Sequence, residues 1–155
     1  MNVYQFKVAL DYDKRTYRNI EILETQTLED FHEIIFNAFD RYDEHLYSFY
    51  ITRKRINSSH SRYKAPEFTD STYFEDNFNA EFGQDKFDAS EAEINSLRLN
   101  IKDKIYYLFD FGDCWWHEIT LLSITETNKI KGYPRIIKKS GESPEQYPDF
   151  EEEDY

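Results

Sequence analysis

The chain has 155 residues and a formal net charge of −12, and 18% of its residues are aromatic. This length fits one domain with its own core, and so many aromatic side chains favour buried strands. Only four Gly and four Pro are present, which excludes a turn-rich sandwich and disorder along the whole chain. The acidic charge repels phosphate backbones, so direct nucleic-acid binding is disfavoured.

The acidic charge is concentrated in two segments. Residues 67–93 carry a net charge of −8 and residues 142–155 a net charge of −7, which leaves +3 for the remainder. We therefore predict a single domain over residues 1–155, with an acidic excursion at about 53–90 and an acidic tail from about 142.

Cysteine content and hydropathy predict a cytoplasmic protein. The single cysteine, Cys114, rules out an intramolecular disulfide and suits a reducing compartment. The first residues lack the basic patch and apolar run of a signal peptide. No apolar stretch approaches the roughly 20 residues that span a bilayer, so we expect no membrane partner.

The first half of the chain predicts a β-hairpin, a helix and a strand. Residues 3–10 alternate between apolar and polar side chains, and a second strand is expected at 17–23. Thr27 and Asp30 form a helix-start signature. An apolar stripe at helical spacing follows, and the helix should end near residues 40–42. The stripe consists of Leu28, Phe31, Ile35, Ala38 and Phe39.

The next strand is expected at residues 46–51, which gives the order strand-strand-helix-strand of a β-grasp-like start. The aromatic residues within 53–90 show no regular spacing, so we expect a long, partly ordered surface excursion there. A short helix is expected after it, at about 90–96. Two β-prone runs, 105–111 and 116–124, flank Gly112 and predict a second, aromatic hairpin. The expected fold class is α+β, with this hairpin completing a mixed or antiparallel sheet. A turn is expected at residues 132–134.

Residues 107–119 read Tyr-Leu-Phe-Asp-Phe-Gly-Asp-Cys-Trp-Trp-His-Glu-Ile. This segment resembles the Tyr-x-Phe-Asp-Phe/Tyr-Gly-Asp-x-Trp-x-His-x-Ile signature of the plasmid pRiA open-reading-frame-three-like family. Its members are also known as TnpR-like passenger proteins of insertion sequences. Further matches include His32, His45 and Tyr133, and together they cover residues 3–51 and 97–146. The resemblance implies an association with plasmids or mobile elements but no established chemistry. A literal resolvase is not supported, because no ordered nucleophilic serine lies among arginines.

Asp110, Asp113 and His117 are the strongest candidates for a metal or ligand site. They flank one hairpin turn, and a histidine with two carboxylates can hold a divalent metal with open positions. The favoured alternative is structural: the carboxylates accept turn N–H groups and the imidazole donates to a neighbour. A divalent metal is therefore possible but not favoured, and no other cofactor is indicated.

Trp115 and Tyr133 complete the candidate ligand-binding set with Asp110, Asp113 and His117, because exposed aromatic rings can stack on a ligand. Our first hypothesis is a non-enzymatic binding or adaptor domain that presents the Gly112–His117 turn to a protein or small ligand. The alternative is a metal-dependent hydrolase or nuclease centred on Asp110, Asp113 and His117.

Overall fold

The computed structural model describes residues 1–76 and 86–147. Three helices lie in this part: α1 (Leu28–Ala38), α2 (Ser59–Arg62) and α3 (Ser71–Asp76). Two 3-10 turns follow, η1 (Ala89–Glu91) and η2 (Ile94–Leu97). The strands are β1 (Asn2–Leu10), β2 (Asp13–Leu23), β3 (Tyr47–Tyr50), β4 (Glu67–Thr69), β5 (Lys86–Asp88), β6 (Lys104–Phe109), β7 (Trp115–Glu126) and β8 (Arg135–Ser140).

The strands of the described residues form one sheet in the order β5-β4-β3-β6-β7-β1-β2-β8. Neighbours in this order run antiparallel except β4 and β5, which are parallel. The α+β class and the two predicted hairpins are confirmed. The predicted strand-strand-helix-strand order is also present, but β3 pairs with β6 and not with the first hairpin. A β-grasp arrangement is therefore not established beyond the order of its first elements.

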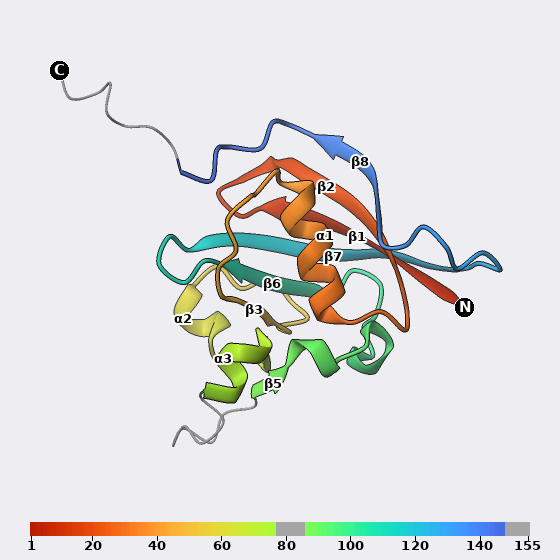
Figure 1. Cartoon of the computed structure of the whole chain (residues 1–155), viewed down its shortest axis with the longest axis horizontal. Coiled ribbons are helices and arrows are strands. Elements are labelled where there is room, and N and C mark those ends of the chain that lie inside the picture. The colour runs from red at the N-terminus through yellow and green to blue at the C-terminus, as the bar shows by residue number, and fades with distance from the viewer. Residues whose placement is uncertain (77–85, 148–155) are drawn as a thin grey trace.

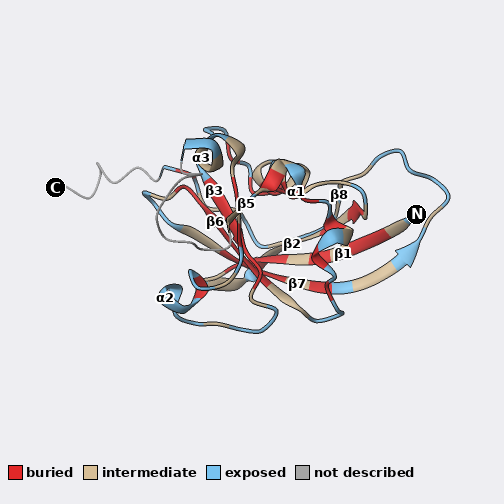
Figure 2. Cartoon of the chain, turned by 90° about the horizontal axis from the view of Figure 1, so that it is seen from below, coloured by how far each residue is buried: buried red, intermediate tan, exposed pale blue. Residues whose placement is uncertain are grey.

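Helix α1 packs across one face of the sheet, and α2 lies on the other (Figures 1 and 2). The predicted apolar stripe of α1 is buried in the main core. The Phe31 ring lies 4.9 Å from Phe6 of β1 and 5.6 Å from Phe49 of β3, so the helix holds distant strands together. The predicted start is confirmed, because Thr27 and Asp30 form a reciprocal capping box. The helix ends at Ala38, slightly earlier than expected.

Two short strands lie in the described part of the predicted excursion at 53–90. Within it, β4 pairs with β3 and β5 pairs with β4, so this segment extends the sheet. Residues 77–85 lie outside the described part. The expected short helix at 90–96 is wrong in type, because η1 and η2 are two separate 3-10 turns. Strand β8, which pairs with β2, was not predicted at all.

The smaller core on the α2 side contains Tyr50, Tyr106 and Leu108, with Trp116 packed against it. Of the acidic tail, residues 142–147 are described and contain no helix or strand, and residues 148–155 lie outside the described part. Within the described residues, every helix is too short or too polar to cross a membrane.

Gly141 ends β8 against the first hairpin and offers a test of this junction. Its φ is +77°, and an added Cβ would lie 2.6 Å from Thr16 Oγ1 and 3.0 Å from Thr16 Cα. Gly132 has a φ of +88° but open space around it. Gly132→Ala should therefore lower the free energy of unfolding by about 1–2 kcal/mol, which is the cost of a Cβ at a left-handed φ. Gly141→Ala should lower the free energy of unfolding by about 1–3 kcal/mol more than that, because its Cβ would also overlap Thr16. Urea unfolding measures the stability of both variants. Equal losses of stability in the two variants would contradict the close packing of Gly141 on Thr16.

Candidate functional site

The turn between β6 and β7 uses Asp110 as a structural residue. Asp110 has a φ of +65° and is 6% exposed. Its Oδ1 accepts hydrogen bonds from the N–H groups of Gly112 (3.0 Å) and Asp113 (3.2 Å). Asp113 itself is exposed. The carboxylate of Asp110 therefore closes the turn, as the structural alternative expected.

His117 is fully buried on the α1 side of β7. Its Nδ1 donates to the Tyr107 carbonyl (3.2 Å), and its Nε2 accepts from Arg41 Nη2 (2.9 Å). Burial, and after it the Arg41 charge, holds the pKa of His117 well below its usual value, so the ring is neutral. Both ring nitrogens are engaged inside the protein, which leaves neither to a ligand.

The predicted metal trio is not assembled in this geometry. Within residues 1–76 and 86–147, no three His, Cys, Asp or Glu side chains form a group that could hold a metal ion. Asp110 instead directs Oδ2 toward His45, at 3.5 Å. Cys114 is exposed and donates to the Phe111 carbonyl, so it does not pair with the buried His117.

Trp115 and Tyr133 lie near opposite ends of α1. Trp115 is half-buried, and the Arg41 guanidinium lies 5.5 Å from its ring, just beyond the helix end. The Tyr133 carbonyl accepts from the Gln26 side chain (2.8 Å), just before the helix start. The eleven residues of α1 span about 16 Å, so the five candidate ligand-binding residues do not form one site.

A hollow of about 530 Å³ opens beside α1 and brings together two histidines that the family resemblance had marked, His32 and His45. Its walls come from α1, from residues 44–47 and from the segment after β4. The lining residues are Glu29, His32, Glu33, Glu44, His45, Leu46, Tyr47, Asp70 and Thr72. The predicted excursion thus supplies one wall, through Asp70 and Thr72.

His32 is held in one orientation at this hollow. Its Nδ1 lies 2.6 Å from the Tyr107 hydroxyl and its Nε2 lies 3.0 Å from Glu44 Oε1. Its ring stacks on Tyr47, with centroids 3.7 Å apart and planes 5° apart. A neutral ring with its proton on Nε2 satisfies both contacts, since it donates to Glu44 and accepts from Tyr107. The hydrogen bond from His32 lowers the pKa of Glu44.

Tyr47 carries the one unusual group of this wall. Its side chain is 2% exposed, and its hydroxyl is buried with no hydrogen-bond partner in the described part of the chain. Burial raises the pKa of Tyr47 most, and after it the neighbouring Tyr107, Glu29, Asp70 and Asp88 raise it further. The hydroxyl is therefore protonated and lies in an acidic field, and both its O–H donor and its acceptor oxygen are unused by the described residues.

His45 closes the same end through the segment that follows β8. Its Nε2 lies 2.5 Å from the Tyr147 hydroxyl, which donates to Asp43 Oδ2 at 2.7 Å. Gln146 binds the same loop, because its Oε1 accepts from the Tyr42 and Asp43 N–H groups. These contacts fix the loop between α1 and β3.

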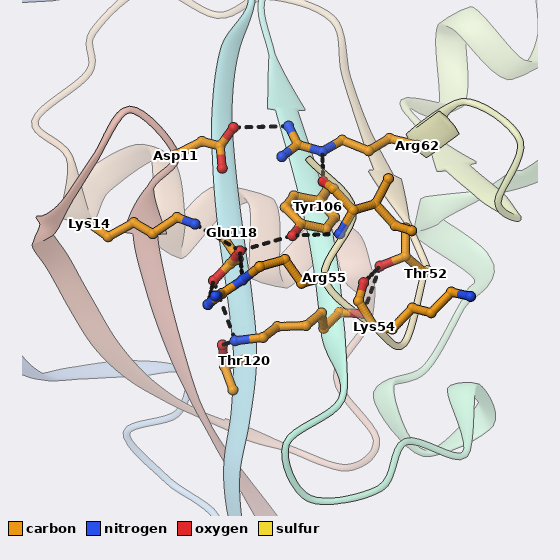
Figure 3. Close-up of polar contacts among 11 residues, drawn as sticks. Asp11, Lys14, Thr52, Lys54, Arg55, Arg62, Tyr106, Glu118 and Thr120 are labelled. Carbon is orange, nitrogen blue, oxygen red and sulfur yellow. Dashed lines mark hydrogen bonds and ion pairs between the residues drawn. The ribbon is translucent and has the colours of Figure 1, made fainter. Parts of the chain in front are cut away.

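A separate charged cluster lies on the opposite face of the sheet (Figure 3). Glu118 of β7 is 5% exposed, and the Arg55 guanidinium donates to both of its carboxylate oxygens, at 3.2 Å each. Lys14 (3.1 Å), Lys104 (3.3 Å) and the Tyr106 hydroxyl (2.8 Å) also donate to it. Burial alone would raise the pKa of Glu118, but these partners outweigh it and lower the pKa to about 2. Three cations thus surround one carboxylate.

Sequence reasoning missed Tyr47, Glu44, Arg41 and the role of Glu118. Each acts through partners far away in the chain, so no local spacing marks it. The nearest usable signal is the alternation of β7, because neighbours in a strand such as His117 and Glu118 point to opposite faces of the sheet.

The fold and geometry define an α+β protein with a helix-lined acidic hollow at one end of a mostly antiparallel sheet. The chain belongs to the family of plasmid pRiA4b ORF-3-like proteins, whose model matches residues 2–149. The family recognised from the sequence is therefore confirmed. Among curated protein sequences, none shows significant similarity to the chain.

A solved structure is similar throughout. It is the protein of unknown function MM3350 from Methanosarcina mazei Go1, with a TM-score of 0.70 and 19% identity. The match covers 94% of this chain and 72% of that one. At 19% identity, this similarity shows a shared fold and gives no evidence about function.

Glu118→Gln tests the cluster of Figure 3. The variant should lose about 1–3 kcal/mol of stability at pH 7, because three cations lose their shared carboxylate. The folded pKa of about 2 lies below the usual 4.5, so the wild-type advantage is present above pH 4.5. It should shrink as the pH falls from 4.5 toward 2.

The measurement is urea unfolding at several pH values. Glu21→Gln is the matched control, since Glu21 pairs with the half-exposed Arg135 at 2.7 Å and should contribute at most about 1 kcal/mol. A pH-independent difference for Glu118→Gln would contradict the assigned charge network.

Proposed function

We propose that this protein is a non-enzymatic binding or adaptor domain, associated with plasmids or mobile elements and acting in the cytoplasm. Its ligand site is the hollow beside α1. The observation that carries the proposal is the buried, unpartnered Tyr47 hydroxyl in the wall of that hollow, within the described residues. Buried hydroxyls are normally hydrogen-bonded, so one without a protein partner at a hollow supports a role in ligand binding.

The size and rigidity of the hollow support the same function. Its volume of about 530 Å³ falls in the range of small-molecule sites, about 300–1,000 Å³. His32 is fixed by Tyr107 and Glu44, and His45 by Tyr147, so contacts within the protein hold both walls in place. A preorganised wall loses little entropy on binding.

The β6–β7 turn gives a second surface for a protein partner. Asp113 is exposed and Trp115 is half-buried there. The metal-dependent hydrolase alternative gains no comparable support, because His117 is neutral, buried and hydrogen-bonded through both ring nitrogens.

Blocking the hollow tests this function. Thr72 is exposed and lines the hollow, so Thr72→Trp should fill it. Ser96→Trp is the matched control, since Ser96 is exposed and lines a smaller hollow of about 180 Å³. We would record relaxation-filtered NMR spectra of a mixture of neutral, cationic and anionic fragments with each protein.

We expect at least one fragment to be broadened by the wild type and by Ser96→Trp, and not by Thr72→Trp. Its shift changes in the labelled protein should centre on His32, His45 and Tyr47. The proposal fails if no fragment is broadened, or if Thr72→Trp retains all binding.

A further inference from the structure

The charge around the hollow is of one sign. Four of its lining residues are the acids Glu29, Glu33, Glu44 and Asp70. Among the described residues that line it, Lys and Arg are absent, and its two histidines are tied to Glu44 and Tyr147. Glu29 and Glu33 are four residues apart, so their carboxylates stand on the same side of α1. Such a site attracts cations.

The acids repel one another in the absence of a cation. Burial raises the pKa of Glu29, and Glu33, Asp30, Asp88 and Asp70 each raise it further. A positive charge placed among these carboxylates would relieve their repulsion, and that relief contributes to binding.

The Tyr47 hydroxyl gives independent evidence of the occupant's chemistry. In the part of the chain that is described, the hydroxyl has both an unused O–H donor and an unused acceptor oxygen, and its surroundings are negative. The negative surroundings favour a positively charged group, and the N–H groups of such a cation can donate to the hydroxyl oxygen. A bare metal ion fits less well, since no cluster of three His, Cys, Asp or Glu ligands is present in the described residues.

We propose that the hollow binds an organic cation with N–H donors, namely the ammonium or guanidinium of a Lys or Arg side chain from a partner protein. This rests on the proposed function and names the class of ligand. The N–H groups reach the carboxylates of Glu29, Glu33 and Asp70 and the Tyr47 hydroxyl. The stem of the basic side chain packs on Leu46, which is 38% exposed at the rim.

The probes are capped single amino acids. N-acetyl-arginine N-methylamide and N-acetyl-lysine N-methylamide carry the charge, and N-acetyl-citrulline N-methylamide is the neutral isostere of the arginine probe. NMR shift titration against the labelled, full-length protein gives each affinity. We expect a preference of about tenfold or more for the arginine probe over citrulline, which is the range of hydrogen bonds to charged groups. A higher salt concentration should weaken the binding of the arginine probe and leave the binding of the citrulline probe unchanged.

Three variants test the individual groups. Glu29→Gln and Glu33→Gln should each weaken the arginine probe about two- to tenfold. Glu91→Gln, exposed and outside the lining, should leave its affinity unchanged. Tyr47→Phe should weaken the probe and also raise the midpoint of urea unfolding, because it removes an unsatisfied buried hydroxyl. A purely structural role of Tyr47 would not change affinity.

The outcomes separate this inference from the proposed function. If citrulline binds as tightly as arginine at the hollow, the cation class is wrong while the binding function stands. If neither these probes nor the fragment mixture perturbs the hollow, both fail. Tighter binding of spermidine than of the arginine probe would overturn the protein side chain as the source and retain the organic cation.

Discussion

The contact between the Tyr107 hydroxyl and His32 Nδ1 is the interaction on which the site depends. It joins the middle of β6 to α1 at 2.6 Å, and both residues are almost completely buried. Because buried polar groups are normally hydrogen-bonded, this contact fixes the His32 ring against Tyr47 and directs Nε2 to Glu44. The Tyr107 carbonyl meanwhile accepts from His117. One residue therefore orients two histidines, one at the hollow and one in the core.

The sheet also places the acidic hollow and a cluster of cations on opposite faces. His117 and Glu118 are adjacent in β7, yet one lies in the main core and the other among cations on the opposite face (Figure 3). The alternation of a strand imposes this division. The α1 side holds the acidic hollow and the opposite side holds Lys14, Arg55 and Lys104. The net charge of −12 conceals this arrangement, so charge predicts partners only when it is resolved by face.

Local signals predicted the elements that have clear periods. The α1 capping box, its apolar stripe and both hairpins came from spacings within a few residues. Strands β4 and β5 did not, because three residues cannot show an alternation and their stability comes from pairing. The site was predicted less well for the same reason. His32, Asp70 and Tyr47 meet only through the sheet, and a family resemblance marked His32 and His45 without indicating that they share a hollow.

The signature turn contacts a residue of the hollow, although it is not part of the lining itself. Asp110 uses Oδ1 to accept the N–H groups of its own turn, and Oδ2 faces His45 at 3.5 Å. The turn geometry thus sets the position of a charge that orients a wall residue of the hollow. A carboxylate engaged on both oxygens is poorly suited to serve a metal, but it is well suited to link the hairpin to the wall of the hollow. The motif that suggested a metal site from the sequence is more simply explained as a structural support for one wall of the hollow.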